Sequence, residues 1–274
     1  MLTDTFALPE TTPAVSVKTI NIAGVLVYLC GVAELTPAQA QDVTVVFHSH
    51  GRTRSHKNAL AVAFQAFSEI KDRKKGLVFV TMDNRNHGAR AIDELSIQTW
   101  NKGNVHHGQD MMSMVDGIAA DYKLVMNHLQ AYVGSEFIIT EFIATGTSLG
   151  GHVTWNLLAQ DKRIQRGVIF VGCPNMTALL LDRVGEQKDT ILWNKYLEQV
   201  CLDRDAEIAG ITGKEIVILN GAEDTLVSDK FTKGWVEKYG KNNKVLYKVQ
   251  EGRGHGLSFG MVEDFVKWLA EVVN

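Results

Sequence analysis

Cysteine and proline are both scarce in this sequence, which has three cysteines and four prolines among 274 residues. The cysteines are Cys30, Cys173 and Cys201, an odd and sparse set that argues against a disulfide framework and suits a reducing compartment. No stretch rich in proline, glycine and serine divides the chain. We therefore expect a single domain over residues 1–274.

An excess of one charge and long apolar runs are lacking too. The formal net charge is −3, so nothing suggests nucleic acid as a partner, and no block of like charge suggests an interaction tail. No apolar run reaches the length of a membrane span, and the first residues lack the basic and apolar regions of a signal peptide. We expect a cytoplasmic protein with a small-molecule substrate and neither a nucleic-acid nor a membrane partner.

What the sequence does contain is 45% hydrophobic residues, arranged in an alternation of strand and helix patterns. Short β-branched runs are typical of strands buried on both faces, and apolar residues three and four apart indicate helices. We predict a hairpin from residues 15–22 and 25–30, and later strands over 43–47, 76–82, 137–144, 167–171, 216–219 and 244–249. We predict helices over 58–70, 111–129, 151–160, 229–239 and 261–273.

This alternation predicts an α/β protein with a mainly parallel sheet of eight strands and helices on both faces. Residues 174–212 interrupt the alternation because they are rich in helical patterns and contain no strand. We interpret them as a short helical insertion that covers the sheet like a lid.

A glycine-rich segment, Gly-Thr-Ser-Leu-Gly-Gly at 146–151, lies between a predicted strand and a predicted helix. This context is typical of a nucleophile elbow, which holds a serine on a tight turn between the two elements. Glycine lets the backbone crowd together there, and the N-terminus of the helix favours developing negative charge. The alternative is an ordinary turn with a helix-capping serine. We predict that Ser148 is a catalytic nucleophile.

A serine nucleophile needs a base, and the base needs a carboxylate that orients it. Asp224 and His255 each follow a predicted strand, and the carboxyl ends of parallel strands share one edge of the sheet. We therefore expect both to meet Ser148, although alone each would be an ordinary turn or loop residue. Glu223 is the alternative acid; the Gly-x-x-Asp spacing and the shorter side chain favour Asp224.

Two backbone N–H groups are needed to hold the oxyanion of an acyl-transfer reaction. We assign one to Leu149, which follows the nucleophile, and the other to Arg52 in the loop after the strand 43–47, with Thr53 as the alternative donor. Gly51 lets this loop approach closely. We expect His50 to pin the loop, and His48 to be structural.

Together these segments resemble the α/β-hydrolase superfamily over almost the full length of the chain. The resemblance rests on His50-Gly51, the segment Asp-Asn-Arg-Asn-His-Gly at 83–88, the elbow, Gly221-x-x-Asp224 and Gly-His255-Gly. Asn86 stands where the superfamily pattern has glycine. The resemblance implies that Asp83, Arg85 and His87 brace a loop. The short insertion and the elbow look most like small esterases, feruloyl or cinnamoyl esterase-like enzymes, and short-lid peptidase relatives.

The function that follows is hydrolysis of a carboxylic ester, thioester or amide through an acyl-enzyme intermediate. The same scaffold also supports acyl transfer, peptide hydrolysis and C–C bond cleavage, or a ligand-binding protein without catalysis. Several histidines are present, but no His-Glu-x-x-His or paired-cysteine spacing appears, so we expect no metal and no cofactor.

Two further segments are candidates for substrate contact. Residues 96–111 form a long polar stretch in which Trp100, His106 and His107 are the expected contacts; the alternative is a plain surface loop. Directly after the oxyanion loop, a group of cations gathers at a predicted helix start, where the helix dipole disfavours them. These are Arg52, Arg54, His56 and Lys57. They are expected either to grip a carboxylate or phosphate of the substrate or to be solvated.

Overall fold

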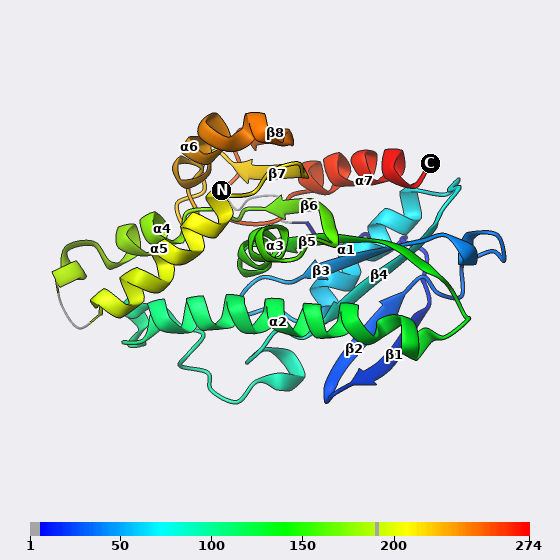
Figure 1. The fold of residues 1–274 in the computed structure, drawn as a ribbon, viewed down its shortest axis with the longest axis horizontal. Coiled ribbons are helices and arrows are strands. Elements are labelled where there is room, and N and C mark those ends of the chain that lie inside the picture. The colour runs from blue at the N-terminus through cyan, green and yellow to red at the C-terminus, as the bar shows by residue number, and fades with distance from the viewer. Residues whose placement is uncertain (1–5, 190–191) are drawn as a thin grey trace.

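The computed structural model describes residues 6–189 and 192–274, and these residues build one eight-stranded sheet between layers of helices (Figure 1). The strand order is β1-β2-β4-β3-β5-β6-β7-β8. The strands are β1 (Val17–Ile22), β2 (Val25–Cys30), β3 (Val43–Ser49), β4 (Gly76–Met82), β5 (Ile139–Thr147), β6 (Ile164–Phe170), β7 (Glu215–Gly221) and β8 (Lys244–Gln250). β1 and β2 pair antiparallel and the pairs from β4 to β8 are parallel, which confirms the predicted α/β class.

The helices divide between the two faces of this sheet. One face is covered by α1 (His56–Glu69) and α7 (Phe259–Val273), whose apolar residues share a core. The other is covered by α2 (His107–Val133), α3 (Leu149–Gln160) and α6 (Lys230–Tyr239), which share a second core. Short 3-10 helices lie between the longer elements: η1 (Gln39–Gln41), η2 (Gly88–Arg90), η3 (Trp100–Lys102), η4 (Gly185–Asp189) and η5 (Gly240–Asn242).

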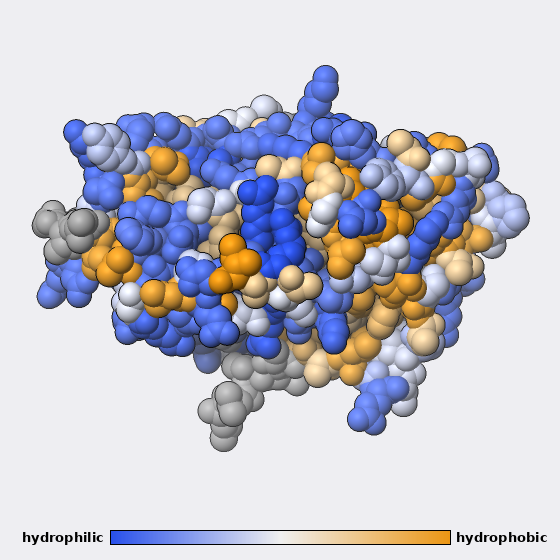
Figure 2. Space-filling view, turned by 90° about the horizontal axis from the view of Figure 1, so that it is seen from below, coloured by the Kyte–Doolittle hydropathy of each residue, from blue (hydrophilic) through white to orange (hydrophobic). Residues whose placement is uncertain are grey.

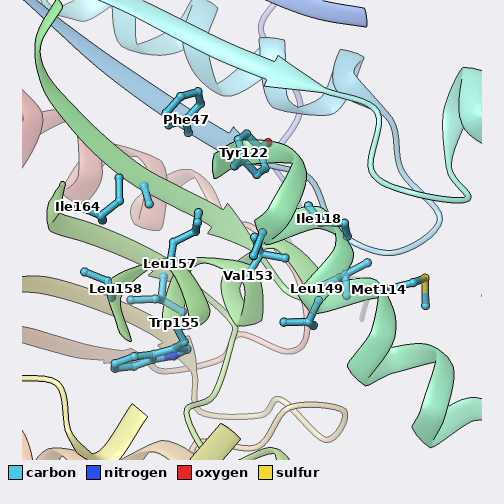
Figure 3. Close-up of a cluster of buried hydrophobic side chains, with 14 of the residues drawn as sticks. Phe47, Met114, Ile118, Tyr122, Leu149, Val153, Trp155, Leu157, Leu158 and Ile164 are labelled. Carbon is cyan, nitrogen blue, oxygen red and sulfur yellow. The ribbon is translucent and has the colours of Figure 1, made fainter. Parts of the chain in front are cut away.

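Helix α3 is the best-buried helix of the fold, and it carries the elbow at its start. Leu149, Val153 and Trp155 are almost completely inaccessible. Leu149 and Val153 lie on the side of α3 that faces α2, and Trp155 points to the opposite side (Figure 3). The Trp155 ring contacts Trp235 of α6 with centroids 4.7 Å apart. Each large side chain buried in this way contributes about 1.5–3 kcal/mol of transfer free energy. This packing fixes the first turn of α3 relative to the strand that precedes it.

Residues 174–212 contain the two helices α4 (Met176–Val184) and α5 (Lys195–Ala209), which lie between β6 and β7 in the chain. Their N-termini are capped by Asn175 and Asn194, whose side chains accept hydrogen bonds from the first turns. Leu197 and Cys201 on the inner side of α5 belong to the core that contains α2 and α3. The segment is thus packed at the end of the sheet where α3 begins (Figure 1).

The surface carries small groups of hydrophobic residues among hydrophilic ones, as one face of the molecule shows (Figure 2).

Within the part of the chain that the structure describes, no helix combines the length and the apolar character needed to cross a membrane. Cys30, Cys173 and Cys201 are buried and free, so no disulfide contributes to the fold.

Candidate active site

Ser148 lies on the sharp turn between β5, which ends at Thr147, and α3, which begins at Leu149. Its backbone φ is 54° and ψ is −110°, a left-handed conformation that costs energy for a residue with a side chain. Glycine is required on both sides of the turn. A Cβ at Gly146 would lie 2.2 Å from the carbonyl oxygen of Gly150, and one at Gly150 would lie 1.9 Å from that of Ser49. The sequence motif therefore folds into the tight turn that its glycines predict.

A chain of two hydrogen bonds links Ser148 to two residues far away in the sequence. The Oγ of Ser148 lies 2.8 Å from Nε2 of His255, and Nδ1 of His255 lies 2.7 Å from Oδ2 of Asp224. Because Asp224 is ionised, Nδ1 carries the ring proton and Nε2 is left to accept the proton of the serine. The structure thus brings together the three residue types of an acyl-transfer triad.

The Asp224 carboxylate is held rigidly in the loop after β7, where only 3% of the residue is exposed. Its Oδ1 accepts hydrogen bonds from the N–H groups of Leu226 and Val227, at 2.9 and 2.8 Å. Burial acts to raise the pKa of Asp224, but the hydrogen bond and charge of His255 and these two N–H donors outweigh it, so the pKa lies below its ordinary value. The carboxylate therefore remains ionised beside the imidazole.

The loop of Asp224 and the loop of His255 are tied to each other by the backbone. The N–H of Ala222 donates to the carbonyl of Gln250 and that of Glu223 donates to the carbonyl of Arg253, at 3.0 and 2.8 Å. Gly221 allows this approach, because a Cβ there would lie 2.3 Å from the carbonyl oxygen of Arg253. These contacts fix the distance between the carboxylate and the imidazole.

Two backbone N–H groups beside Ser148 have no hydrogen-bond acceptor among the described residues, those of Leu149 and Arg52. Leu149 opens α3, where the first N–H groups have no partner within the helix. The loop of Arg52 approaches closely, because a Cβ on Gly51 would lie 3.6 Å from that of Ser148. Thr53 continues the turn with φ 64° and donates its hydroxyl to the carbonyl of Arg52. The geometry is suited to a pair of oxyanion donors.

His50 anchors this loop, as the sequence predicted. Its Nδ1 donates to the carbonyl of Gly51 at 2.8 Å, and its Nε2 accepts from the N–H of Asn84 at 3.0 Å. Asp83 accepts from the N–H of His56 and of Ala89, at 2.8 and 2.9 Å. The loops after β3 and β4 therefore brace each other behind the site.

The structure explains why asparagine rather than glycine occupies position 86. Its φ is 58°, and asparagine tolerates this left-handed conformation better than other residues with a side chain. Its amide oxygen also accepts from the N–H groups of Ile92 and Asp93, both at 2.8 Å, and its amide nitrogen donates to Ser96 at 2.6 Å. A glycine could not make these contacts, so Asn86 holds the segment that leads to the site.

A cavity of about 650 Å³ opens above Ser148 and His255. Part of its wall comes from the segment 96–111, through Ile97, Gln98, Thr99, Lys102 and Met111. Trp100, His106 and His107, the three contacts predicted within this segment, are not among the residues that line the cavity. His107 is buried under the Trp100 ring, with centroids 4.9 Å apart, and His106 is exposed.

Three of the four cations predicted after the oxyanion loop line the cavity, and the fourth does not. Arg52, Arg54 and Lys57 line the cavity, together with Gly51 and Thr53. His56 does not, because its ring stacks on Tyr28 with centroids 3.9 Å apart and its Nδ1 lies 2.9 Å from Asp83.

Two further parts of the wall were not predicted, Arg183 of α4 and the residues Phe6, Ala7 and Leu8. No local signal in the sequence marks either one, because both reach the cavity only through the tertiary fold.

Several buried histidines lie around the site, but their side chains are not grouped as metal ligands would be. In the described ranges, no group of three or more histidine, cysteine, aspartate or glutamate side chains is placed to hold a metal ion. Burial lowers the pKa of His48 and of His152 to about 3, so both rings are neutral. Each has a structural partner: Nδ1 of His48 lies 2.7 Å from the Thr145 hydroxyl, and Nδ1 of His152 lies 3.1 Å from the carbonyl of Cys173.

No protein-family model matches the sequence, and no curated protein matches it. Solved structures do resemble it. TT1662 from Thermus thermophilus is 18% identical with a TM-score of 0.72, over 96% of this chain and 99% of that one. A cold-adapted esterase from an Arctic intertidal metagenomic library is 16% identical with a TM-score of 0.61, over 98% and 100%. The esterase Pf2001 from Pyrococcus furiosus is 15% identical with a TM-score of 0.59, over 94% and 91%.

These similarities extend over nearly the whole of each chain and concern the fold. With the strand order and the position of the elbow, they show that the chain has the α/β-hydrolase fold. The fold predicted from the sequence is thereby confirmed.

Proposed function

We propose that this protein is a serine hydrolase that cleaves a carboxylic ester, with Ser148, His255 and Asp224 as its catalytic triad. One observation carries the proposal: an unbroken hydrogen-bonded chain joins a serine on a strained elbow to a histidine and a buried carboxylate, over 2.8 and 2.7 Å. Two of the proteins that share the fold are esterases, which supports an ester as the substrate.

In the first half of the reaction, the Ser148 hydroxyl attacks the carbonyl carbon of the ester while Nε2 of His255 takes its proton. The Asp224 carboxylate holds the imidazole in the required tautomer and stabilises the imidazolium that forms. The carbonyl oxygen becomes negatively charged and accepts hydrogen bonds from the N–H groups of Leu149 and Arg52. His255 then donates its proton to the departing alcohol, which leaves an acyl group on Ser148.

In the second half, water attacks the acyl group and His255 again acts as the base. The same two N–H groups stabilise the second tetrahedral intermediate. Its collapse returns the proton to Ser148 and releases the carboxylic acid. No metal or cofactor is needed for either step.

The proposal is tested by labelling the protein with a fluorophosphonate and locating the label by mass spectrometry. We expect the label on Ser148 and turnover of short p-nitrophenyl esters. The Ser148→Ala variant should lose both, with kcat lower by a factor on the order of 10⁶. Full esterase activity in a clean preparation of this variant would refute the triad. Labelling without turnover across a broad ester panel would instead indicate a ligand-binding protein.

A further inference from the structure

The cavity above Ser148 has a one-sided charge. Its charged lining residues are Arg52, Arg54, Lys57, Lys102 and Arg183, and among the described residues no aspartate or glutamate lines it. The protein as a whole has a formal net charge of −3, so this concentration of cations does not reflect the composition. Cations without acidic neighbours favour a ligand of negative charge.

Arg52 and Arg183 differ from the other three cations because they are half-buried, whereas Arg54, Lys57 and Lys102 are exposed to solvent. Burial lowers the pKa of Arg52, and burial together with the charge of Arg52 lowers that of Arg183 to about 10. Both guanidinium groups still carry a full charge at neutral pH. The structure thus holds two like charges on the wall of one cavity, each partly removed from solvent.

Among the residues that the structure describes, no carboxylate forms an ion pair with either of the two guanidinium groups. Nη1 of Arg52 donates to the carbonyl of Ile97 at 3.2 Å, and Nη2 of Arg183 donates to the carbonyl of Leu226 at 3.2 Å. Nη1 of Arg183 lies 3.4 Å from Nε2 of His107, whose Nδ1 donates to the carbonyl of Gln98. Nε of Arg183 has no partner among the described residues. All these acceptors are neutral.

The acids that act on Arg183 are engaged elsewhere. Asp224 pairs with His255, and Asp182 accepts from the ammonium of Lys230 at 2.6 Å. Other arginines of this protein do have acidic partners: Arg85, Arg90, Arg163, Arg166 and Arg204 form ion pairs. A partly buried charge without a counter-ion is costly, so an anion bound in the cavity would stabilise this pair.

We propose that the substrate of this site is an ester with an anionic group, a carboxylate or a phosphate, and that Arg52 and Arg183 bind this group. The inference rests on the proposed function, because it places the anion in the cavity where the ester would meet Ser148. Guanidinium groups present paired donors that match the oxygens of both anions. Arg183 thereby becomes a residue that determines specificity, contributed by the segment between β6 and β7.

The test compares two esters that differ by one methyl group: mono-p-nitrophenyl adipate, which ends in a carboxylate, and its methyl ester, which is neutral. With the spontaneous rate subtracted, we expect kcat/KM to be about 10- to 100-fold higher for the anionic ester, the gain of a hydrogen-bonded charge pair. Arg183→Gln should reduce that ratio toward one, mainly through KM. Arg183→Lys, which keeps the charge and loses the fork, should fall between.

Lys102→Gln is the matched control, because it removes one exposed positive charge from the same cavity. We expect it to change the ratio less than about twofold, since solvent screens an exposed charge. If Lys102→Gln and Arg183→Gln reduce the ratio equally, the preference comes from the total positive charge of the cavity. That result would overturn specific binding by Arg52 and Arg183. If Arg183→Gln does not fold, Arg52→Gln replaces it. A third ester, p-nitrophenyl 5-phosphonopentanoate, distinguishes the anions: faster turnover than the adipate indicates a phosphate, slower turnover a carboxylate.

The outcome can be separated from that of the proposed function. If the neutral ester is cleaved as well as the anionic one, the hydrolase stands and the anion site is wrong. If neither ester is cleaved, calorimetry with the Ser148→Ala variant decides: binding of the adipate but not of its methyl ester supports the anion site without catalysis. Binding of both equally, or of neither, refutes it.

Discussion

Asp224 and Glu223 are neighbours in the sequence but have opposite surroundings. The Asp224 carboxylate is buried and accepts three hydrogen bonds, from His255, Leu226 and Val227. Glu223 is exposed, and its backbone N–H is the group that bonds the loop of Arg253. At the scale of the residue, the geometry selects Asp224 as the partner of the imidazole.

Asp224→Asn is therefore expected to lower kcat by a factor on the order of 10⁴, because an amide favours the wrong tautomer of the histidine. The measurement is steady-state hydrolysis of a p-nitrophenyl ester at neutral pH. Glu223→Gln is the matched control, since it makes the same chemical change one residue away at a solvated position. Comparable losses in the two variants, or a larger loss for Glu223→Gln, would assign the acid to the wrong residue.

The sequence predicted which side chains would meet at Ser148 and predicted one part of the cavity wall, the loop of Gly51 and Arg52. It did not predict Arg183 or the residues of segment 96–111 that line the cavity. Strand ends are fixed by topology, so residues directly after β5, β7 and β8 must lie at one edge of the sheet. Arg183 depends instead on how α4 packs, which has no local signal in the sequence.

The hydrophobic runs of the sequence predicted where each strand lies, but polar residues near the strand ends made the exact bounds hard to predict. β6 begins at Ile164, whereas the sequence predicted a start at residue 167. The prediction missed the first residues because Gln165 and Arg166 interrupt the apolar pattern. Arg166 is compatible with a strand since it pairs with Glu215 of β7 at 3.0 Å and with Glu141 of β5. Helix α2 begins at His107 rather than after Asp110, and Leu197 and the Trp100 ring pack against Gly108 in its first turn.

The elbow is the element whose glycines are most constrained, and Gly150→Ala tests this. The added Cβ would lie 1.9 Å from the carbonyl oxygen of Ser49, so the backbone of β3 or of α3 must shift. We expect a loss of stability of about 1–3 kcal/mol from overpacking and a fall in kcat, because the turn also aims Ser148. Urea unfolding and ester hydrolysis measure the two effects.

Gly234→Ala is the matched control for this change. Gly234 lies inside helix α6, and a Cβ there meets nothing within 4 Å. Alanine has the higher helix propensity, so we expect this variant to be more stable by about 0.4–1 kcal/mol. A Gly150→Ala protein as stable and active as Gly234→Ala would show that the elbow tolerates a side chain.

At the scale of the whole molecule, the histidines set how stability depends on pH. Five of the nine histidines are buried, and burial lowers the pKa of each of these five. For His48, His107 and His152 the pKa falls to about 3, and for His50 to about 4. The folded protein therefore keeps these rings neutral at a pH at which the unfolded chain protonates them.

The sign of the effect follows from proton counting. Below pH 6.5, the ordinary pKa of histidine, the unfolded chain binds protons that the folded protein does not. The free energy of unfolding therefore decreases as the pH is lowered. This loss continues until the pH reaches the lowered pKa values of the folded state. The lowered pKa values of Asp83 and Asp224 act elsewhere, because their contribution is present above pH 3.8 and is lost only below it. The lowered pKa of Glu215 likewise acts only below pH 4.5. Burial raises the pKa of Asp205, so this one carboxyl opposes the histidines. Between about pH 4.5 and 6.5, the five buried histidines therefore outweigh the carboxyl groups.

We therefore expect the free energy of unfolding, measured with urea, to fall steadily between pH 6.5 and 4.5. Each buried histidine should contribute at most about 1.4 kcal/mol per pH unit to the slope. His48→Asn should reduce the slope by up to that amount, because asparagine does not titrate and its amide nitrogen takes the position of Nδ1 beside the hydroxyl of Thr145. The same change at His128, which is exposed on α2, should leave the slope as it is. A slope that is flat over this interval, or that is equal in the His48 and His128 variants, would show that the buried rings take up protons without unfolding.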